Sequence, residues 1–287
     1  MGCMIINNSM LPTRILGKTK HQATILGLGG EGILRTTGYF KEAEAVIKKA
    51  VEVGINYFDT APAYQQSRDY LGTYLWKFAK REQIFLASKT HDRSYEGTML
   101  LLEDSLKRLK TNYLDLLQLH DLRTKEDIDE IFSSSGAIHA LEEAKKQGKI
   151  RFVGITGHHE PRILIEAIKR YSFDTVLLCV NAGDSHYMPF IGSVIPEARN
   201  KGMGVIAMKV TAQGNALSSI TMKEAFYYVL SQDVDLAIIG CKTPQEVQEN
   251  MNLAKNFSQL NKEELNKIEN NTKDSIEETN FFKRGMY

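Results

Sequence analysis

Eight short apolar runs, rich in β-branched residues, recur along this 287-residue chain at near-regular intervals. Most of them are continuously hydrophobic, which is typical of parallel strands buried on both faces. Their carboxyl ends fall near residues 29, 59, 89, 120, 156, 181, 209 and 240, and one strand–helix–strand unit takes roughly 30 residues. The spacing therefore predicts an α/β fold, a (β/α)8 barrel of the TIM type. The runs cover residues 24–28, 55–58, 84–88, 114–119, 151–156, 175–180, 204–208 and 236–239.

The segments between and around these runs complete the predicted architecture. Residues 221–224 and 243–246 read as helix capping boxes, the second with Pro at the first helical position. Residues 12–23 predict a short N-terminal β-hairpin that closes the bottom of the barrel. Residues 262–278 predict one extra C-terminal helix that is polar and therefore largely exposed. No linker or low-complexity tract interrupts the chain, so we expect a single domain over residues 1–287.

A glycine-rich segment, residues 27–32, offers an alternative fold. It matches the GxGxxG pattern of a dinucleotide-binding Rossmann domain, and Asp59 ends the next strand. In that fold a helix opens at the third glycine. Here Gly32 is followed by a loop, and helical periodicity starts only near Lys41. Together with eight units rather than six, this favours the barrel.

Composition limits the classes of function. The chain has 36 basic and 35 acidic residues, a net charge of +1, so nothing points to a nucleic-acid or membrane partner. Cys3, Cys179 and Cys241 are widely spaced, which predicts reduced thiols rather than disulfides or a metal site. Residues 1–10 lack the basic and apolar segments of a secretory signal. We therefore expect a cytoplasmic protein, and the sequence leaves its oligomeric state open.

Four polar side chains follow consecutive predicted strands. Asp59 ends the second strand and Tyr64 lies in its loop, while Lys89 and His120 end the third and fourth strands. Active sites of such barrels lie at the carboxyl ends of the strands. A free phenol has a pKa near 10, which a neighbouring ammonium lowers, and a buried carboxylate keeps that ammonium charged. The four residues predict a proton-transfer site. The structural alternative is a buried Asp59–Lys89 ion pair with Tyr64 and His120 as polar fillers.

These residues carry a resemblance to a known family. Residues 56–64 (NYFDTAPAY), Lys89 after FLAS and residues 116–120 (LLQLH) resemble the three signatures of the aldo-keto reductase superfamily, and residues 148–154 (GKIRFVG) resemble its fifth-strand segment. The resemblance spans about residues 13–255. It implies Tyr64 as general acid/base, tuned by Lys89 and Asp59, with His120 orienting the carbonyl of the substrate. Hydride would pass between a nicotinamide cofactor and a carbonyl or alcohol carbon, without metal.

The resemblance also implies a set of cofactor-binding residues, from which the sequence departs at several places. The family usually has Ser-Asn after the fifth strand, and here Thr156 and Gly157 stand there. Asn181 is followed by Ala where Gln is common. Met208 and Lys209 replace the usual aromatic residue and resemble one subgroup of the superfamily. The alternative for Met208 is that its side chain only fills the core. The implied cofactor set is Gly29, Gly30, Thr156, Gly157, Asn181, Met208, Lys209, Val210, Gly240, Lys242, Glu246, Glu249 and Asn250.

The choice of cofactor depends on the start of the last helix. Lys242 matches a basic position that commonly meets the 2′-phosphate of NADP(H), so we expect NADP(H). Glu246 stands where Gln or Arg is usual, and its carboxylate would repel that phosphate and favour NAD(H), unless it only closes the capping box with Thr243. Relatives with the Met-Lys pattern often carry a cysteine-rich iron–sulfur segment. The C-terminal stretch of this chain has no cysteine, so no cluster is expected.

Three functions remain open at this level. The first is an NAD(P)H-dependent aldo-keto reductase that acts on an aldehyde, ketone or sugar. The second is a cofactor-binding regulator or redox sensor on the same barrel, without turnover. The third is a hydrolytic or lyase barrel that uses Asp59 and His120 without nicotinamide, which the Lys242–Asn250 region disfavours. Residues 280–287, rich in aromatic side chains, could fold over the barrel mouth, and Asp184, His186 and Tyr187 could line the site or only cap a loop. His158 and His159 are assigned to a loop.

Overall fold

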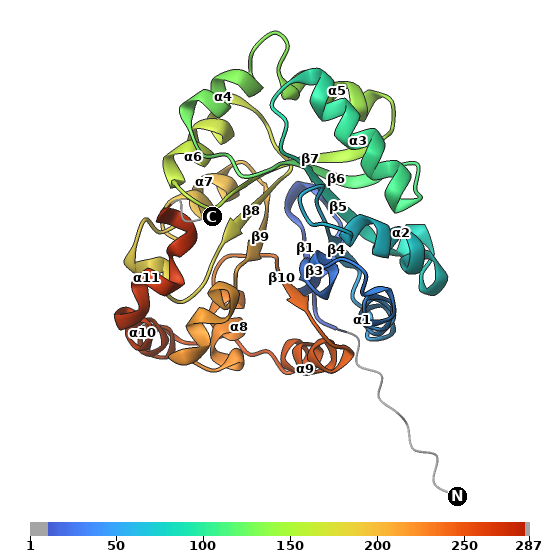
Figure 1. Cartoon of the computed structure of the whole chain (residues 1–287). Helices are drawn as coiled ribbons and strands as arrows, with labels where there is room; N and C mark the ends of the chain where they lie inside the picture. The colour runs from blue at the N-terminus through green and yellow to red at the C-terminus, as the bar shows by residue number, and fades with distance from the viewer. Residues whose placement is uncertain (1–10, 285–287) are drawn as a thin grey trace, which may run out of the picture.

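The computed structural model describes residues 11–284, and within them the eight predicted strands close into one barrel (Figure 1). The strands follow the order β10-β3-β4-β5-β6-β7-β8-β9, and each neighbouring pair is parallel. The barrel prediction is confirmed and the Rossmann alternative is wrong. The strands are β3 (Leu26–Gly32), β4 (Tyr57–Asp59), β5 (Phe85–Thr90), β6 (Leu114–Leu119), β7 (Ile150–Gly157), β8 (Thr175–Cys179), β9 (Gly204–Met208) and β10 (Leu236–Cys241).

Nine of the eleven α-helices of the described chain follow the strands and surround the barrel. The first begins at Phe40, well beyond the third glycine of the GxGxxG segment, because a 3-10 turn and a loop come between them. The longest predicted interval, between the fourth and fifth strands, holds two helices rather than one. The helices are α1 (Phe40–Glu52), α2 (Ser67–Phe78), α3 (Tyr95–Leu109), α4 (Lys125–Ile131), α5 (Ala137–Lys146), α6 (Pro161–Arg170), α7 (Val194–Asn200), α8 (Met222–Leu230) and α9 (Pro244–Lys255).

The N-terminal hairpin lies under the barrel, as predicted. Its strands β1 (Thr13–Ile15) and β2 (Gln22–Thr24) pair antiparallel. The turn between them approaches the start of β9 so closely that a Cβ on Gly17 would lie 2.1 Å from the backbone nitrogen of Gly204. Gly17 also has a φ of +45°, which favours glycine. The hairpin therefore closes the amino ends of the strands and leaves the opposite end to the polar strand-end residues.

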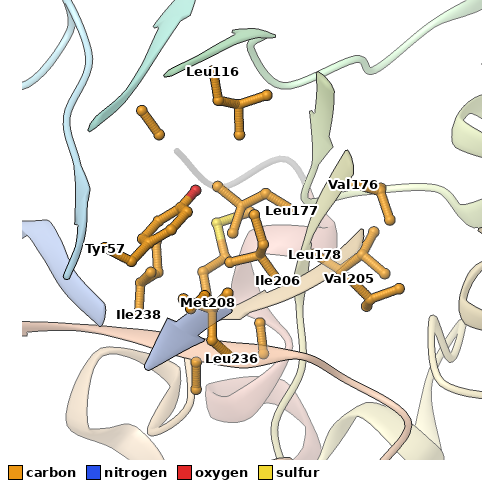
Figure 2. Close-up of a cluster of buried hydrophobic side chains, with 14 of the residues drawn as sticks. Tyr57, Leu116, Val176, Leu177, Leu178, Val205, Ile206, Met208, Leu236 and Ile238 are labelled. Carbon is orange, nitrogen blue, oxygen red and sulfur yellow. The ribbon is translucent and has the colours of Figure 1, made fainter. Parts of the chain in front are cut away.

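The barrel interior is filled by side chains rather than open. Figure 2 shows Tyr57 from β4, Leu177 from β8, and Ile206 and Met208 from β9 converging in the interior. Tyr57 and Leu177 are fully buried, and Met208 is 6% exposed. Layers of large side chains of this kind are what hold an eight-stranded barrel together. The reactive groups must therefore sit above this core, at the carboxyl ends of the strands.

The C-terminal segment differs from the prediction of one helix over residues 262–278. It forms α10 (Lys262–Asn271), a 3-10 turn (Lys273–Ser275), α11 (Ile276–Thr279) and a final 3-10 turn (Phe281–Arg284). The break follows Thr272, whose hydroxyl donates to the Glu269 carbonyl oxygen at 2.9 Å. The turn after it brings the following residues back over the loop behind β8, where Phe282 is fully buried. As predicted, α10 is largely exposed.

The described part of the tail packs against the loop after β8, at the periphery of the barrel (Figure 1). The buried Lys283 ammonium pairs with the buried Asp184 carboxylate and donates to the carbonyl oxygens of Tyr187 and Met188 at 2.7 and 3.0 Å. Asp184 also accepts from two backbone N–H groups of the loop after β8. It therefore stabilises a loop rather than lining a cavity. Residues 285–287 of the predicted aromatic tail, together with residues 1–10, which include Cys3, lie outside the described residues.

None of the helices within residues 11–284 is long and apolar enough to cross a membrane.

Candidate active site

Two cavities meet at the carboxyl end of the barrel. We name the first the mouth chamber, which has a volume of about 360 Å³. It lies at the carboxyl ends of β3 to β7 and of β9, and all but one of its twelve lining residues carry an ionisable side chain. The lining residues are Glu31, Arg35, Ala63, Tyr64, His91, Arg93, His120, Asp121, Arg123, Asp127, His158 and Lys209.

We name the second cavity the glycine groove, which has a volume of about 660 Å³ and runs from Tyr64 to the start of α9. Glycines form its walls because neighbouring backbone lies too close for side chains: a Cβ on Gly30 would lie 2.7 Å from the Asp59 carbonyl oxygen. Ten of the thirteen implied cofactor residues line this groove. They are Gly29, Gly30, Met208, Lys209, Val210, Gly240, Lys242, Glu246, Glu249 and Asn250.

The four strand-end residues come together where the two cavities meet. Lys89 and Asp59 form a buried ion pair at the floor of the glycine groove, which Asp59 lines, and the Lys89 ammonium also donates to the Thr60 carbonyl oxygen at 3.0 Å. That ammonium lies 4.7 Å from the centre of the Tyr64 ring. The His120 ring packs edge-on against the Tyr64 ring, with 6.0 Å between their centres. Tyr64 lines both cavities, so its phenol lies beside a buried cation at the junction.

Electrostatics within this group follow from its burial. Burial raises the pKa of the Asp59 carboxyl and lowers that of the Lys89 ammonium, and the attraction between the two charges opposes both shifts. Burial, and then the Lys89 charge, hold the pKa of His120 well below its ordinary value. His120 is therefore neutral at pH 7, so its ring has one N–H donor and one acceptor nitrogen.

A second cation lies over the Tyr64 ring. The Arg35 guanidinium is 5.3 Å from the ring centre and pairs with the Glu31 carboxylate at 2.9 Å. Glu31 also accepts from the Lys209 ammonium at 3.0 and 3.2 Å, which joins the end of β3 to the end of β9. Burial opposes ionisation of Glu31, but these two cations outweigh it and lower its pKa. Arg35, Glu31 and Lys209 all line both cavities, as Tyr64 does.

The loop after β6 is fixed by one arginine. The Arg93 guanidinium donates to the carbonyl oxygens of His120 and Asp121 at 2.9 and 3.0 Å, and to the Asp127 carboxylate at 2.9 Å. Asp121 has a φ of +53°, in the left-handed region that residues other than glycine seldom occupy. Contacts from several directions therefore hold His120 and Asp121 at the chamber wall.

Three of the implied cofactor residues lie outside both cavities. The Thr156 hydroxyl accepts from the Asp121 backbone N–H at 2.7 Å. At Gly157 a Cβ would lie 2.8 Å from the Leu164 side chain, so α6 fills the space that a larger residue would need. The buried Asn181 side chain turns toward the C-terminal tail, where it contacts the Thr279 carbonyl oxygen and accepts from Gly183 N–H.

The start of α9 departs from the capping box predicted at residues 243–246. The Thr243 hydroxyl accepts from Glu246 N–H at 3.2 Å, as predicted. The Glu246 carboxylate, however, accepts from the backbone N–H of Lys242 at 2.7 Å instead of that of Thr243. The box is therefore half formed, whereas the one at Thr221 and Glu224 is complete. At the end of the glycine groove, the Glu246 carboxylate thus accepts a hydrogen bond from the Lys242 backbone N–H.

Sequence reasoning missed several chamber residues. His158 directly follows β7, the same strand-end position that identified Lys89 and His120, so position alone was a usable signal. Arg35 follows Glu31 by four residues, but its place over Tyr64 depends on the fold of the β3–α1 loop. Among the described residues, no group of three or more His, Cys, Asp or Glu side chains is arranged to hold a metal ion.

Comparisons with known proteins agree with this geometry. Residues 25–226 match the model of the aldo/keto reductase family. Over 216 residues the chain is 31% identical to L-galactose dehydrogenase of Arabidopsis thaliana, covering 70% of this chain and 66% of that protein. It is 27% identical to the uncharacterized oxidoreductase YqkF of Bacillus subtilis (strain 168), covering 82% and 89% of the two chains.

A solved structure shows the same architecture. The holo form of aldo-keto reductase AKR11C1 from Bacillus halodurans superposes with a TM-score of 0.76 at 25% identity, covering 91% of this chain and 96% of that one. The family match covers most of the barrel, including all four strand-end residues. The chain therefore belongs to the aldo/keto reductase family of oxidoreductases.

Proposed function

We propose that this protein transfers hydride between NAD(P)(H) in the glycine groove and a carbonyl or alcohol carbon in the mouth chamber, with Tyr64 as the proton donor and acceptor. One observation carries the proposal: Tyr64 lines both cavities and lies beside the Lys89 and Arg35 cations. A proton donor for this reaction must reach the substrate oxygen while the cofactor lies alongside. The junction of the two cavities meets that need.

The residues of the glycine groove fit a dinucleotide. Backbone at Gly29, Gly30 and Gly240 forms its walls, and Lys209 places an ammonium in it. Glycine walls allow close approach of a flat or phosphorylated ligand, and an ammonium suits a diphosphate. When bound there, a nicotinamide supplies or accepts the hydride. The proposed cofactor set narrows to the ten implied residues that line the groove, without Thr156, Gly157 and Asn181.

Each member of the proposed catalytic group has a distinct task. Tyr64 gives its proton to the substrate oxygen in reduction and takes it back in oxidation. Positive charge at Lys89 stabilises the phenolate that Tyr64 becomes, and Asp59 keeps Lys89 charged in its buried position. The neutral His120 donates a hydrogen bond to the substrate oxygen and so orients the carbonyl.

The geometry changes the expected cofactor. Sequence analysis favours NADP(H) because of Lys242. In the structure the Glu246 carboxylate lies against the Lys242 backbone N–H, and Glu249 lines the same end of the groove. Two carboxylates beside one lysine disfavour a 2′-phosphate, whereas a ribose hydroxyl can donate to a carboxylate. We therefore propose that NAD(H) binds at least as well as NADP(H).

The decisive experiment pairs cofactor titration with turnover. Fluorescence titration with NADH and NADPH is expected to show binding to the wild type and to Tyr64→Phe alike. Turnover on a panel of small aldehydes, ketones and aldoses is expected in the wild type and to fall at least a hundredfold in Tyr64→Phe. Tyr74→Phe is the matched control, because Tyr74 also lies under a cation, Lys77 at 4.6 Å, but lines neither cavity.

The outcomes separate the alternatives. If neither NADH nor NADPH binds at millimolar concentration, the proposal of an oxidoreductase is wrong. Tight binding without turnover on the panel by the wild type would favour the regulator or redox sensor. Equal turnover in Tyr64→Phe and wild type would remove Tyr64 as the proton donor.

A further inference from the structure

A second histidine stands beside the proposed catalytic group. His158 directly follows β7, lines the mouth chamber and is 8% exposed. Its ring lies 6.2 Å from the His120 ring, which in turn lies 6.0 Å from the Tyr64 ring. Tyr64, His120 and His158 are therefore consecutive neighbours in the wall of the chamber. If the reacting oxygen lies between Tyr64 and His120, a substituent on the neighbouring carbon lies within reach of His158.

His158 is oriented by a carboxylate. Its Nδ1 lies 2.6 Å from Asp121 Oδ1, and Asp121 also binds the Arg123 guanidinium at 2.6 Å. The Asp121 backbone is held in its left-handed conformation by Thr156 and Arg93. Such strain persists only where the surroundings fix it, and it is concentrated at functional sites. The loop thus holds Asp121 in a position where its carboxylate meets His158.

The pairing decides which hydrogen bond His158 can offer a ligand. Its partners hold the pKa of Asp121 well below its ordinary value despite burial, and an ionised carboxylate only accepts. Burial lowers the pKa of His158, so the ring is neutral at pH 7. The single proton therefore lies on Nδ1, facing Asp121, and Nε2 is the acceptor nitrogen. An acceptor suits a hydroxyl group.

We infer that the Asp121–His158 pair recognises a substrate hydroxyl next to the reacting carbonyl, and that the substrates are therefore α-hydroxy aldehydes, α-hydroxy ketones and open-chain sugars. This inference rests on the proposed function, because it concerns the same chamber. The rest of the lining agrees with it: Ala63 is the one lining residue without an ionisable group. An apolar substrate would desolvate those groups without replacing their hydrogen bonds, at a cost in affinity.

The test compares substrates that differ by one hydroxyl. We would measure kcat/KM for hydroxyacetone against acetone, with NADH and NADPH, in wild type, His158→Phe, His158→Gln and His159→Phe. Wild type is expected to prefer hydroxyacetone by about tenfold or more. In His158→Phe the ratio is expected to fall toward one, through loss of hydroxyacetone turnover with little change for acetone. His158→Gln keeps an acceptor oxygen and is expected to restore part of the ratio.

The control and the contrary outcomes are built into the same series. His159 lies 3.6 Å from Asp121 but does not line the chamber, so His159→Phe is expected to keep the wild-type ratio. A wild type without preference, or a ratio unchanged in His158→Phe, would overturn the inference. So would an equal fall in His159→Phe. Retained acetone turnover shows that a variant is folded. Absence of turnover by the wild type on any carbonyl would instead refute the proposed function.

Discussion

The buried Asp59–Lys89 ion pair allows the chemistry of the site to be separated from its stability. The Lys89 side chain is fully buried and that of Asp59 is 1% exposed. In Lys89→Met, the Asp59 carboxylate would keep only the Gln118 amide at 3.4 Å among its present side-chain partners. Removing one partner of a buried pair typically costs about 3–5 kcal/mol of unfolding free energy. We expect Lys89→Met to lose this amount of unfolding free energy and also to lose turnover.

The size of the loss depends on pH in a predictable direction. Without Lys89, burial would leave the pKa of folded Asp59 far above its unfolded value, so the folded state would bind the extra proton. Stability of Lys89→Met should then fall as pH rises from about 5 to 8, since the unfolded chain releases its proton first. The double variant Lys89→Met/Asp59→Asn carries no buried charge. We expect it to recover most of the stability and none of the turnover.

Urea unfolding of each variant measures the free energies, with cofactor titration to show that the glycine groove is intact. Lys77→Met is the control: Lys77 pairs with Glu44 at 3.1 Å, but the two side chains are 53% and 36% exposed. An exposed pair should contribute less than about 1 kcal/mol. If Lys89→Met cost no more than Lys77→Met, or kept turnover within tenfold of wild type, the reasoning from burial would be wrong.

Three further predictions concern the groove, the chamber and the tail. Glu246→Gln removes the carboxylate at the Lys242 N–H and should shift the affinity ratio toward NADPH by about tenfold, measured by fluorescence titration; an unchanged ratio would mean that Glu246 only caps α9. His120 has a depressed pKa in the folded state, so the unfolded state binds its proton first and stability should fall as pH drops below about 6.5. His120→Gln should flatten that slope in urea unfolding, and an equal slope in both proteins would contradict it. Lys283→Met breaks the buried pair with Asp184, and faster amide exchange at Phe190 and Ile191, which donate to Asp184, is expected by mass spectrometry. Unchanged exchange there would show that the tail does not hold the loop.

The local sequence pattern was enough to predict the barrel and most of the residues at the carboxyl ends of its strands. Continuous apolar runs indicate strands that are buried on both faces. This signal can be read from a short window of sequence, without knowledge of the tertiary contacts. A residue that follows such a run lies at the carboxyl edge whatever the rest of the fold does. Asp59, Lys89 and His120 can therefore be placed together from the sequence alone, and the same rule would add His158.

The direction in which a side chain at that edge points could not be predicted from the neighbouring residues in the sequence. Asn181 ends its strand as His120 does, yet it turns to the Thr279 carbonyl, 98 residues away in sequence. The predicted C-terminal helix is present but ends at Asn271 rather than at residue 278, because the course of the chain depends on what the tail contacts after Thr272.

The sequence by itself therefore determined the barrel and the chemical groups at its mouth. The tertiary structure decided how those groups are paired. Glu31 meets Lys209 across 178 residues and Asp121 meets His158 across 37, and no short window of sequence records either contact. Those pairings set which groups are charged and which nitrogen of His158 faces Asp121, because charge and proton position depend on neighbours in space.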